Sequence, residues 1–211
     1  MVRVITVERQ YGSEGAAFAH HLAETLGWKL VDNSLITEVA RKAGVEPRLA
    51  EHYDERVDPW FHRLEKAIWL DSLDKTGVTD KTAAFDSARM VTFVRDYLQE
   101  CASQGDCVVV GRGAACVLAD TSDALHVFVY APMAQRIQWL LRHFPDRAKE
   151  AEHEIRATDR RRAEYVHRFH HHEWSDPDIY TLMLNSLIGF EGMTRAVLAA
   201  ANLSTGREVA R

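Results

Sequence analysis

Cysteine is scarce in this chain, and the few that occur follow no metal-binding or redox pattern. The three residues, Cys101, Cys107 and Cys116, form no C-x-x-C pair and have no paired histidines at metal-ligand spacing. This pattern favours reduced, mostly buried thiols. Thiols of that kind fit a cytoplasmic protein, because disulfides persist mainly in oxidising compartments.

Long apolar runs and an excess of positive charge are also missing. No stretch approaches the roughly 18 consecutive apolar residues of a membrane-spanning helix. The first residues enter a β-branched run directly, without the pattern of a signal peptide. The net charge is −5 and the isoelectric point is about 6.1, so no overall basic field indicates nucleic-acid binding. We expect neither a membrane nor a nucleic acid as partner.

Two kinds of catalytic centre find no support in the sequence. There is no Gly-x-Ser-x-Gly and no reactive-cysteine environment, so hydrolase chemistry is not indicated. His167 and His170 to His172 form a cluster, but consecutive histidines point in different directions, and no cysteine or carboxylate pair completes a site. We therefore expect no protein-held metal site. With 211 residues and 46% hydrophobic residues, the chain is long enough for one large globular domain.

The N-terminal stretch 4–26 has the layout of a phosphate-binding loop. A β-branched run from Val4 leads into a turn containing Gly12, and apolar residues at helical spacing follow as far as Leu26, before Gly27. Backbone N–H groups of such a turn, together with the positive end of the helix, bind anions. The same layout also occurs as an ordinary first βα unit of an α/β domain.

This loop departs from the G-x-x-x-x-G-K-S/T pattern at its signature positions. Arg9 occupies the place of the first glycine, Glu14 that of the second, Gly15 that of the lysine and Ala16 that of the hydroxyl residue. Glu14 adds negative charge, which opposes phosphate binding, whereas Arg9 and Ser13 are expected to compensate in part. On this alignment, Gly15→Lys with Ala16→Ser should strengthen ATP binding. The turn residues expected to face phosphates are Tyr11, Gly12, Ser13, Glu14, Gly15, Ala16 and Ala17.

The remainder of the chain alternates between strand and helix patterns. Strands are predicted at 28–32, 107–110, 125–130 and 180–185, and helices at 86–103, from Pro132 to 144 and around 190–198. Residues 45–85 read as mixed helix and loop. Strands that alternate with helices imply an α/β fold with a parallel sheet and helices on both faces.

Arginine is concentrated at two places that could hold an anionic ligand. Arg112 lies between two glycines after the central strand 107–110, and ligands of open α/β sheets bind at that end of the strands. The alternative is an arginine that only satisfies backbone carbonyls. The second place is the charged stretch 146–172, where Arg156, Asp159 and Arg160 are expected on one helix face. That stretch is either a solvated helix or a mobile arginine lid over phosphates.

In order along nearly the whole chain, these segments resemble the cytidylate kinase-like family, a divergent branch of the P-loop nucleoside monophosphate kinases. The resemblance rests on the loop and on five later segments, of which the later ones are more specific. The matching segments are Val7-Glu8-Arg9-Gln10-Tyr11-Gly12-Ser13, Asp54-Glu55-Arg56, 105–114, 127–132, 159–165 and 180–186.

The resemblance implies a three-layer P-loop kinase fold with a five-stranded parallel sheet, in a single domain over residues 1–211. It further implies a helical monophosphate-binding insertion near 33–100 and an arginine-rich lid near 145–175, expected to be the most mobile ordered part of the ligand-free protein. The implied activity is transfer of the ATP γ-phosphoryl group to a (deoxy)cytidylate-like monophosphate, with Mg²⁺. Nucleotides are then the small-molecule partners, and a homodimer is possible.

The resemblance also assigns candidate site residues. The catalytic candidates are Arg9, Arg156, Arg160 and Arg162. The substrate-binding candidates are Asp32, Arg56, Arg112, Gly113 and Asp159. Two other functions stay open: a non-catalytic nucleotide-binding or regulatory module, favoured by Gly15 and Ala16, and a kinase for another small acceptor.

Overall fold

A computed structural model describes residues 1–32 and 81–204 of the chain, except for the side chains of 81–90 and 147–149. Contacts divide the chain into two compact units, residues 1–31 with 98–211 and residues 32–97. Within the second unit, the described residues include part of the helix α4 (Lys81–Gln104), on which Phe93 and Tyr97 stack with ring centroids 6.4 Å apart. The expected division into one domain with an insertion stays a prediction.

The first unit is built on a parallel five-stranded sheet, which confirms the predicted fold class. The strand order is β2-β3-β1-β4-β5. The strands are β1 (Val4–Arg9), β2 (Lys29–Val31), β3 (Cys107–Val110), β4 (Ala124–Tyr130) and β5 (Leu182–Asn185). β1 lies in the centre, and its residues are buried from Val4 to Glu8, as a parallel strand covered on both faces requires.

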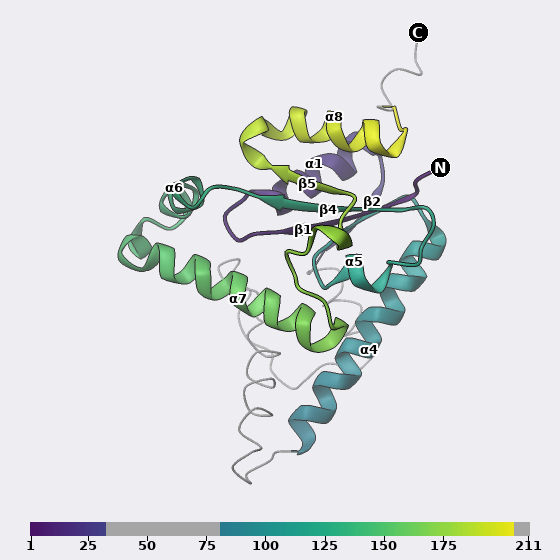
Figure 1. The fold of residues 1–211 in the computed structure, drawn as a ribbon, viewed down its shortest axis with the longest axis horizontal. Coiled ribbons are helices and arrows are strands. Elements are labelled where there is room, and N and C mark those ends of the chain that lie inside the picture. Colours follow the sequence, from purple (N-terminus) through teal and green to yellow (C-terminus); the bar gives the residue numbers. More distant parts are fainter. Residues whose placement is uncertain (33–80, 205–211) are drawn as a thin grey trace. The chain divides into compact units, whose positions relative to one another are not determined.

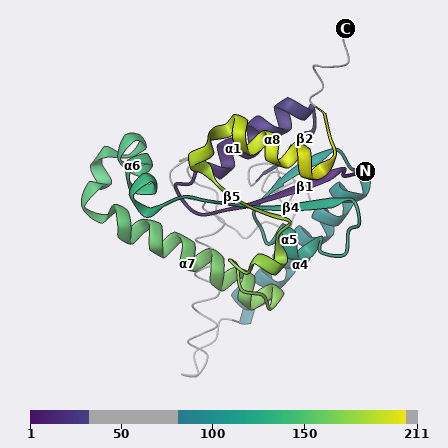
Figure 2. The same ribbon diagram turned by 45° about the horizontal axis from the view of Figure 1, so that its top comes forward.

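Helices cover both faces of this sheet, as the alternating pattern predicts. Figures 1 and 2 show α1 (Gly15–Leu26) and α8 (Gly189–Ala201) on one face, and α5 (Ala114–Val117) and α7 (Ala151–His170) on the other. Helix α6 (Met133–His143) follows β4 beyond the carboxyl edge of the sheet. Short 3₁₀ turns complete the unit at Pro145–Glu150, Pro177–Ile179 and Ser186–Ile188.

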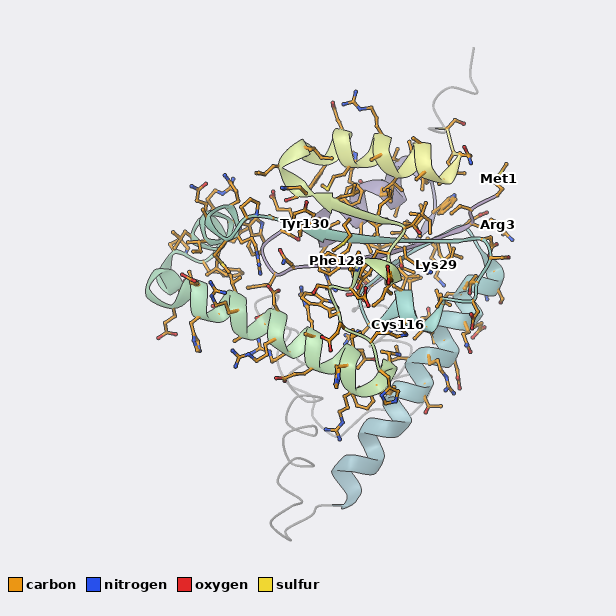
Figure 3. All side chains as sticks on the ribbon, viewed as in Figure 1. Met1, Arg3, Lys29, Cys116, Phe128 and Tyr130 are labelled. Atoms are coloured by element: carbon orange, nitrogen blue, oxygen red, sulfur yellow. The ribbon has the colours of Figure 1, made fainter. Side chains whose placement is uncertain are left out.

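The main core lies between the sheet and the pair α1 and α8. Ile5 and Val7 face this side from β1 and pack with Phe18 and Leu22 of α1 and Met193 of α8, all fully buried. The opposite face of β1 carries Thr6 and Glu8 instead. Thr6 is hydrogen-bonded to His126 Nδ1 at 2.8 Å, and burial lowers the pKa of His126. On the same side Phe128, which is labelled in Figure 3, contacts Trp174 and Tyr180.

Several element boundaries differ from the sequence-based prediction. The strand expected at 180–185 begins at Leu182, since Tyr180 is tied to the turn before it by a hydrogen bond from its backbone N–H to Pro177 O. The helix expected at 86–103 spans Lys81–Gln104. The sheet register places Arg9 beside Val129 and Val7 beside Val110. The loops after β1, β3 and β4 therefore leave the same edge of the sheet, where ligands of such folds bind.

None of the helices in residues 1–32 and 81–204 has both the length and the apolar character needed to cross a bilayer.

Candidate phosphate-binding site

The turn between β1 and α1 has the backbone shape of an anion-binding loop. Gly12 and Glu14 adopt left-handed conformations, with φ of 78° and 62°. Gly12 is required because a Cβ atom there would lie 3.1 Å from the backbone oxygen of Arg136. Glu14 is exposed and stands in a conformation that costs a non-glycine residue roughly 1 kcal/mol.

Helix α1 begins without a side-chain cap. Its first backbone bond runs from Phe18 N–H to Glu14 O, at 2.9 Å. The N–H groups of Gly15, Ala16 and Ala17 find no acceptor in the part of the chain that the structure describes. These unpaired donors, together with the positive end of the helix dipole, form a site suited to a phosphate or another anion.

Arg9 and Gly15 share one space beside this turn. A Cβ atom on Gly15 would lie 2.5 Å from Arg9 Cβ and 3.0 Å from Val129 Cβ. The guanidinium end of Arg9 lies against Gly111, the residue that follows β3. A Cβ atom on Gly111 would overlap Arg9 Nη1. Arg9 Nε is buried and has no hydrogen-bond partner among the described residues. A side chain at position 15 therefore competes with Arg9 for the same space. The expected gain in ATP binding from Gly15→Lys with Ala16→Ser stays a prediction.

Ser13 holds the loop together through its hydroxyl. Its side chain is buried, and Oγ lies 2.8 Å from Gln10 O and 3.3 Å from Val129 O, both of which can accept its proton. Its backbone N–H also bonds to Gln10 O, at 3.3 Å. Gln10 in turn accepts from Ala131 N–H through Oε1. The hydroxyl therefore ties the loop to β4, and the expected phosphate-facing role of Ser13 stays a prediction.

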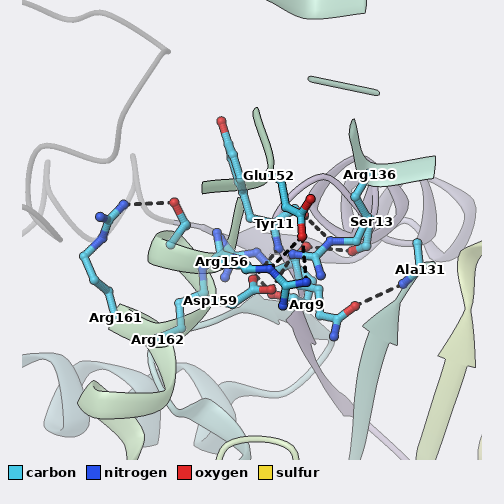
Figure 4. A network of polar contacts seen from close by, with 12 residues as sticks. Arg9, Tyr11, Ser13, Ala131, Arg136, Glu152, Arg156, Asp159, Arg161 and Arg162 are labelled. Atoms are coloured by element: carbon cyan, nitrogen blue, oxygen red, sulfur yellow. Dashed lines mark hydrogen bonds and ion pairs between the residues drawn. The ribbon is translucent and has the colours of Figure 1, made fainter. Parts of the chain in front are cut away.

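Tyr11 connects the loop to α6 and α7, as Figure 4 shows. Its backbone N–H donates to Asp159 Oδ1 at 2.8 Å, and its carbonyl accepts from Arg136 Nε at 2.7 Å. Arg136 and Asp159 form an ion pair in which the Arg136 side chain is only 4% exposed. The Tyr11 hydroxyl lies 3.3 Å from Glu154, and its ring lies edge-on to Trp139. The loop is thus held from three sides before any ligand is present.

The arginines of α7 differ in what they contact. Arg162 Nη1 donates to Arg9 O at 2.6 Å, and its guanidinium lies over the Tyr11 ring. Asp159 and Arg162 are three residues apart and therefore lie on nearly the same side of the helix. Arg156 and Arg160 are exposed, and Arg156 pairs with Glu152 one turn away. Of the four candidates on α7, the structure thus brings Asp159 and Arg162 to the loop.

Arg112 lies at the carboxyl end of β3, as predicted, but it is only 9% exposed and has a left-handed backbone, with φ of 65°. Its carbonyl oxygen is within 3.5 Å of the Tyr165 hydroxyl. The next residue, Gly113, donates its N–H to Glu8 Oε1 at 3.0 Å. A Cβ atom on Gly113 would lie 2.6 Å from His170 Nε2, so this position has no room for a side chain.

Glu8 is a site residue that the sequence reasoning missed. Its carboxylate is buried at the end of β1 and accepts hydrogen bonds from Gly113 N–H and from Trp174 Nε1. The available signal was an acidic residue inside an otherwise apolar strand next to the loop. Asp32, another candidate, directly follows β2 and belongs to the second compact unit. Arg56 lies outside the described residues.

The histidine cluster separates in the structure. His167 is exposed and lies 3.9 Å from Glu173, whereas His170 packs against Gly113 and Tyr165. Burial, with smaller contributions from His171 and His172, lowers the pKa of His170 to about 4. In residues 1–32 and 81–204, no group of three histidine, cysteine or acidic residues is arranged to hold a metal ion.

Comparison with known protein families assigns the chain to one of them. Residues 4–187 match the cytidylate kinase-like family. The chain belongs to that family. The match begins with β1 and continues past β5, so it includes the loop, the Arg112 segment and α7. No curated protein matches the chain in sequence.

Solved structures of low sequence identity share the fold. An uncharacterized protein from Eubacterium ventriosum is 16% identical with a TM-score of 0.69, over 96% of this chain and 99% of that one. Shikimate kinase from Bacteroides thetaiotaomicron is 14% identical with a TM-score of 0.52, over 95% and 98% of the two chains. A gluconokinase from Sinorhizobium meliloti is 11% identical with a TM-score of 0.51, over 94% and 91%. Family and fold together indicate a phosphotransferase.

The buried ion pair between Arg136 and Asp159 should be essential for stability. We expect Asp159→Ala to lower the free energy of unfolding by about 3–5 kcal/mol, because it leaves a buried guanidinium without its counter-charge. The matched control is Glu152→Ala, which removes the partner of Arg156 from an exposed pair and should cost about 0.5 kcal/mol or less. Urea unfolding measures both values. Equal effects would contradict the structural role of the pair.

Whether Gly15→Ala stabilises or destabilises the protein tests the close approach of Arg9 and Gly15. An alanine is normally better than glycine in a helix by up to about 1 kcal/mol. We expect Gly15→Ala to destabilise the protein instead, by about 1–3 kcal/mol, because its Cβ overlaps Arg9 Cβ. In the background of Arg9→Gly, the same change should cost clearly less. Thermal unfolding of the two single variants and the double variant measures this coupling, and a stabilising Gly15→Ala would refute it.

Proposed function

We propose that this protein transfers the γ-phosphoryl group of ATP to a (deoxy)cytidylate-like nucleoside monophosphate. The observation that carries the proposal is the uncapped N-terminus of α1 with the Arg9 side chain beside it. Phosphoryl transfer requires mainly positioning and positive charge around the moving group. A loop with free N–H donors and an adjacent guanidinium supplies both.

In this proposal the donor phosphates bind to the backbone of residues 12–17. The N–H groups of Gly15, Ala16 and Ala17 provide unpaired donors, and Arg9 takes the charge that a P-loop lysine provides elsewhere. A guanidinium suits this task because it is planar and can form two parallel hydrogen bonds to one phosphate. Arg162 orients Arg9 by binding its carbonyl oxygen. Tyr11 and Asp159 act as positioning residues that fix the loop.

The residues of the loop suit the phosphates of ATP better than they suit Mg²⁺. The free donors and the orphaned Arg9 Nε suit the phosphates of ATP. Ala16 offers no hydroxyl to magnesium, and the Glu8 carboxylate is engaged by Gly113 and Trp174. Mg²⁺ commonly binds through substrate phosphates and water with few protein ligands, so the residues present accommodate it in that manner. The ion would neutralise charge on the phosphates.

The acceptor side of the proposal involves Arg112 and Gly113, at the same edge of the sheet as the loop. Arg156 and Arg160 are exposed on α7 and remain candidates for contacts with the acceptor or the transferred group. Asp32, directly before the expected insertion, and Arg56, within it, complete the proposed set. A single domain with a lid near 145–175, a cytoplasmic location and possible homodimer formation belong to the same proposal.

One observation favours a second function, a nucleotide-binding module without catalysis. Position 16 lacks the hydroxyl, and Glu14 introduces a negative charge at the entrance to the turn. These features weaken binding of a magnesium-bound triphosphate more than binding of a smaller anion. The two functions differ in one measurable respect, since only the kinase consumes ATP when an acceptor is present.

Calorimetry with ATP, CMP and dCMP, followed by a radiolabelled transfer assay with Mg²⁺, tests the proposal. Shikimate and gluconate serve as the competing acceptors. We expect transfer to CMP or dCMP, and we expect Arg9→Ala to abolish it while weakening ATP binding about 10- to 100-fold, as loss of a charged hydrogen bond implies. Arg142→Ala, at an exposed position on α6, is the matched control and should change neither. Binding without transfer would favour the module.

Glu14 offers a separable test of charge and backbone strain. We expect Glu14→Gly to tighten ATP binding and to raise the melting temperature, because it removes both the anion and a left-handed non-glycine residue. Glu14→Gln should tighten ATP binding but leave the melting temperature nearly unchanged, since it retains the strain. Calorimetry and thermal unfolding give the two readouts. If ATP affinity does not respond to either change, the turn is not a triphosphate site.

A further inference from the structure

Glu8 is a buried carboxylate for which the proposed reaction has no direct use. It is 3% exposed and lies on the face of β1 opposite the main core, directly before Arg9. Oε1 accepts from Gly113 N–H at 3.0 Å, and Oε2 accepts from Trp174 Nε1 at 3.3 Å. A buried charge is costly unless it is paired or hydrogen-bonded. The two groups that donate to Glu8 therefore indicate which segments its carboxylate stabilises.

The two partners of Glu8 belong to segments that are far apart in sequence. Gly113 closes the loop after β3 that carries Arg112 and that contacts the end of the Arg9 side chain at Gly111. Trp174 belongs to the segment after α7 and packs edge-on to Phe128 of β4, with centroids 5.2 Å apart. The carboxylate thus joins the ends of β1 and β3 to the chain that follows α7.

Other contacts connect the same loop to the same part of the chain. The Tyr165 hydroxyl reaches Arg112 O, and the His170 ring covers Gly113. The Tyr180 hydroxyl, in the same buried aromatic cluster, donates to Trp174 O at 2.6 Å. Among these contacts, the Glu8 carboxylate stands out because one side chain accepts from both segments at once.

We infer that Glu8 is a positioning residue for the acceptor side of the site: by holding Gly113 and Trp174 together it sets the position of the Arg112 loop. The inference rests on the proposed function. Both partners are donors, so the role requires a group that accepts on both sides, as a carboxylate does. A glutamine can accept from only one of them and turns an N–H₂ group toward the other. Glu8 does not touch the ligands itself and acts through the loop.

The kinetic test compares KM for the acceptor with KM for ATP. We expect Glu8→Gln to raise the acceptor KM about tenfold, with the ATP KM changed less than twofold, because the phosphate loop keeps its own contacts. Trp174→Phe should act in the same direction. In the double variant, Glu8→Gln with Trp174→Phe, the glutamine N–H₂ group no longer faces the indole N–H. Its acceptor KM should therefore not exceed that of Glu8→Gln. Multiplied effects, or equal changes in both KM values, would overturn the inference.

A matched control separates positioning from general loss of packing. Tyr180→Phe removes a hydrogen bond in the same buried aromatic cluster but leaves both Glu8 contacts in place. We expect this variant to lower the melting temperature without selectively raising the acceptor KM. If Tyr180→Phe reproduces the kinetic effect of Glu8→Gln, Glu8 is only one of several structural contacts and has no special positioning role.

NMR spectroscopy tests the two hydrogen bonds of Glu8 without any measurement of activity. In ¹⁵N-labelled full-length protein, the Trp174 indole signal is identified by its loss in Trp174→Phe. Hydrogen bonding to a carboxylate shifts a bonded N–H proton downfield, so Glu8→Gln should move the signal of at least the donor that loses its acceptor, Trp174 indole or Gly113 amide, upfield. If neither signal moves, the inference is overturned. If a signal moves but wild-type protein phosphorylates no acceptor, the link through Glu8 stands and the proposed kinase function fails.

Discussion

Much of the site depends on one steric constraint, the space beside α1 that Arg9 occupies and Gly15 leaves open. Arg9 Cβ lies where a side chain at position 15 would begin, and Gly111 leaves room for the guanidinium end. An arginine at the first loop position and a glycine at the lysine position therefore depend on each other. Where the P-loop pattern has a lysine on the helix, this chain thus has a basic side chain at the end of the preceding strand, and we propose that this side chain serves the same phosphates.

Helix α7 and the segment after it contact both loops of the candidate site, the loop after β1 and the loop after β3. Its middle part binds the loop after β1 through Asp159 and Arg162, and its end, with the segment that follows, binds the loop after β3 through Tyr165, His170 and Trp174. One helix thus contacts both loops of the candidate site. The arginines that α7 leaves exposed, Arg156 and Arg160, are those able to move toward a ligand without breaking these contacts.

The family match and the structural neighbours carry different kinds of information about this chain. The family match covers residues 4–187, and the structural neighbours include a shikimate kinase and a gluconokinase. At 11–16% identity these neighbours share the architecture alone. In our proposal the choice of acceptor depends on the few side chains at the carboxyl edge of the sheet, where Arg112 is buried and Gly113 is covered by His170.

The sequence by itself determined the fold class and the place of the site, because these depend on local pattern. The run Cys107 to Val110 is apolar on both faces, as a central parallel strand must be, and the glycine turn before Phe18 marks a strand-to-helix connection. Parallel strands bring their carboxyl ends to one edge, so Arg9 and Arg112 were correctly assigned to the same side of the sheet.

Only the tertiary structure decided what these residues touch. Helical spacing relates the residues of α7 to one another, but it does not say which face meets the loop, and so Arg162 rather than Arg156 or Arg160 contacts Arg9. In the same way, the reason for Gly15 lies in the Arg9 side chain six positions away, and the role of Glu8 lies in Gly113 and Trp174, more than 100 residues away. Such contacts are set by how the sheet and helices pack, and no periodicity in the chain records them.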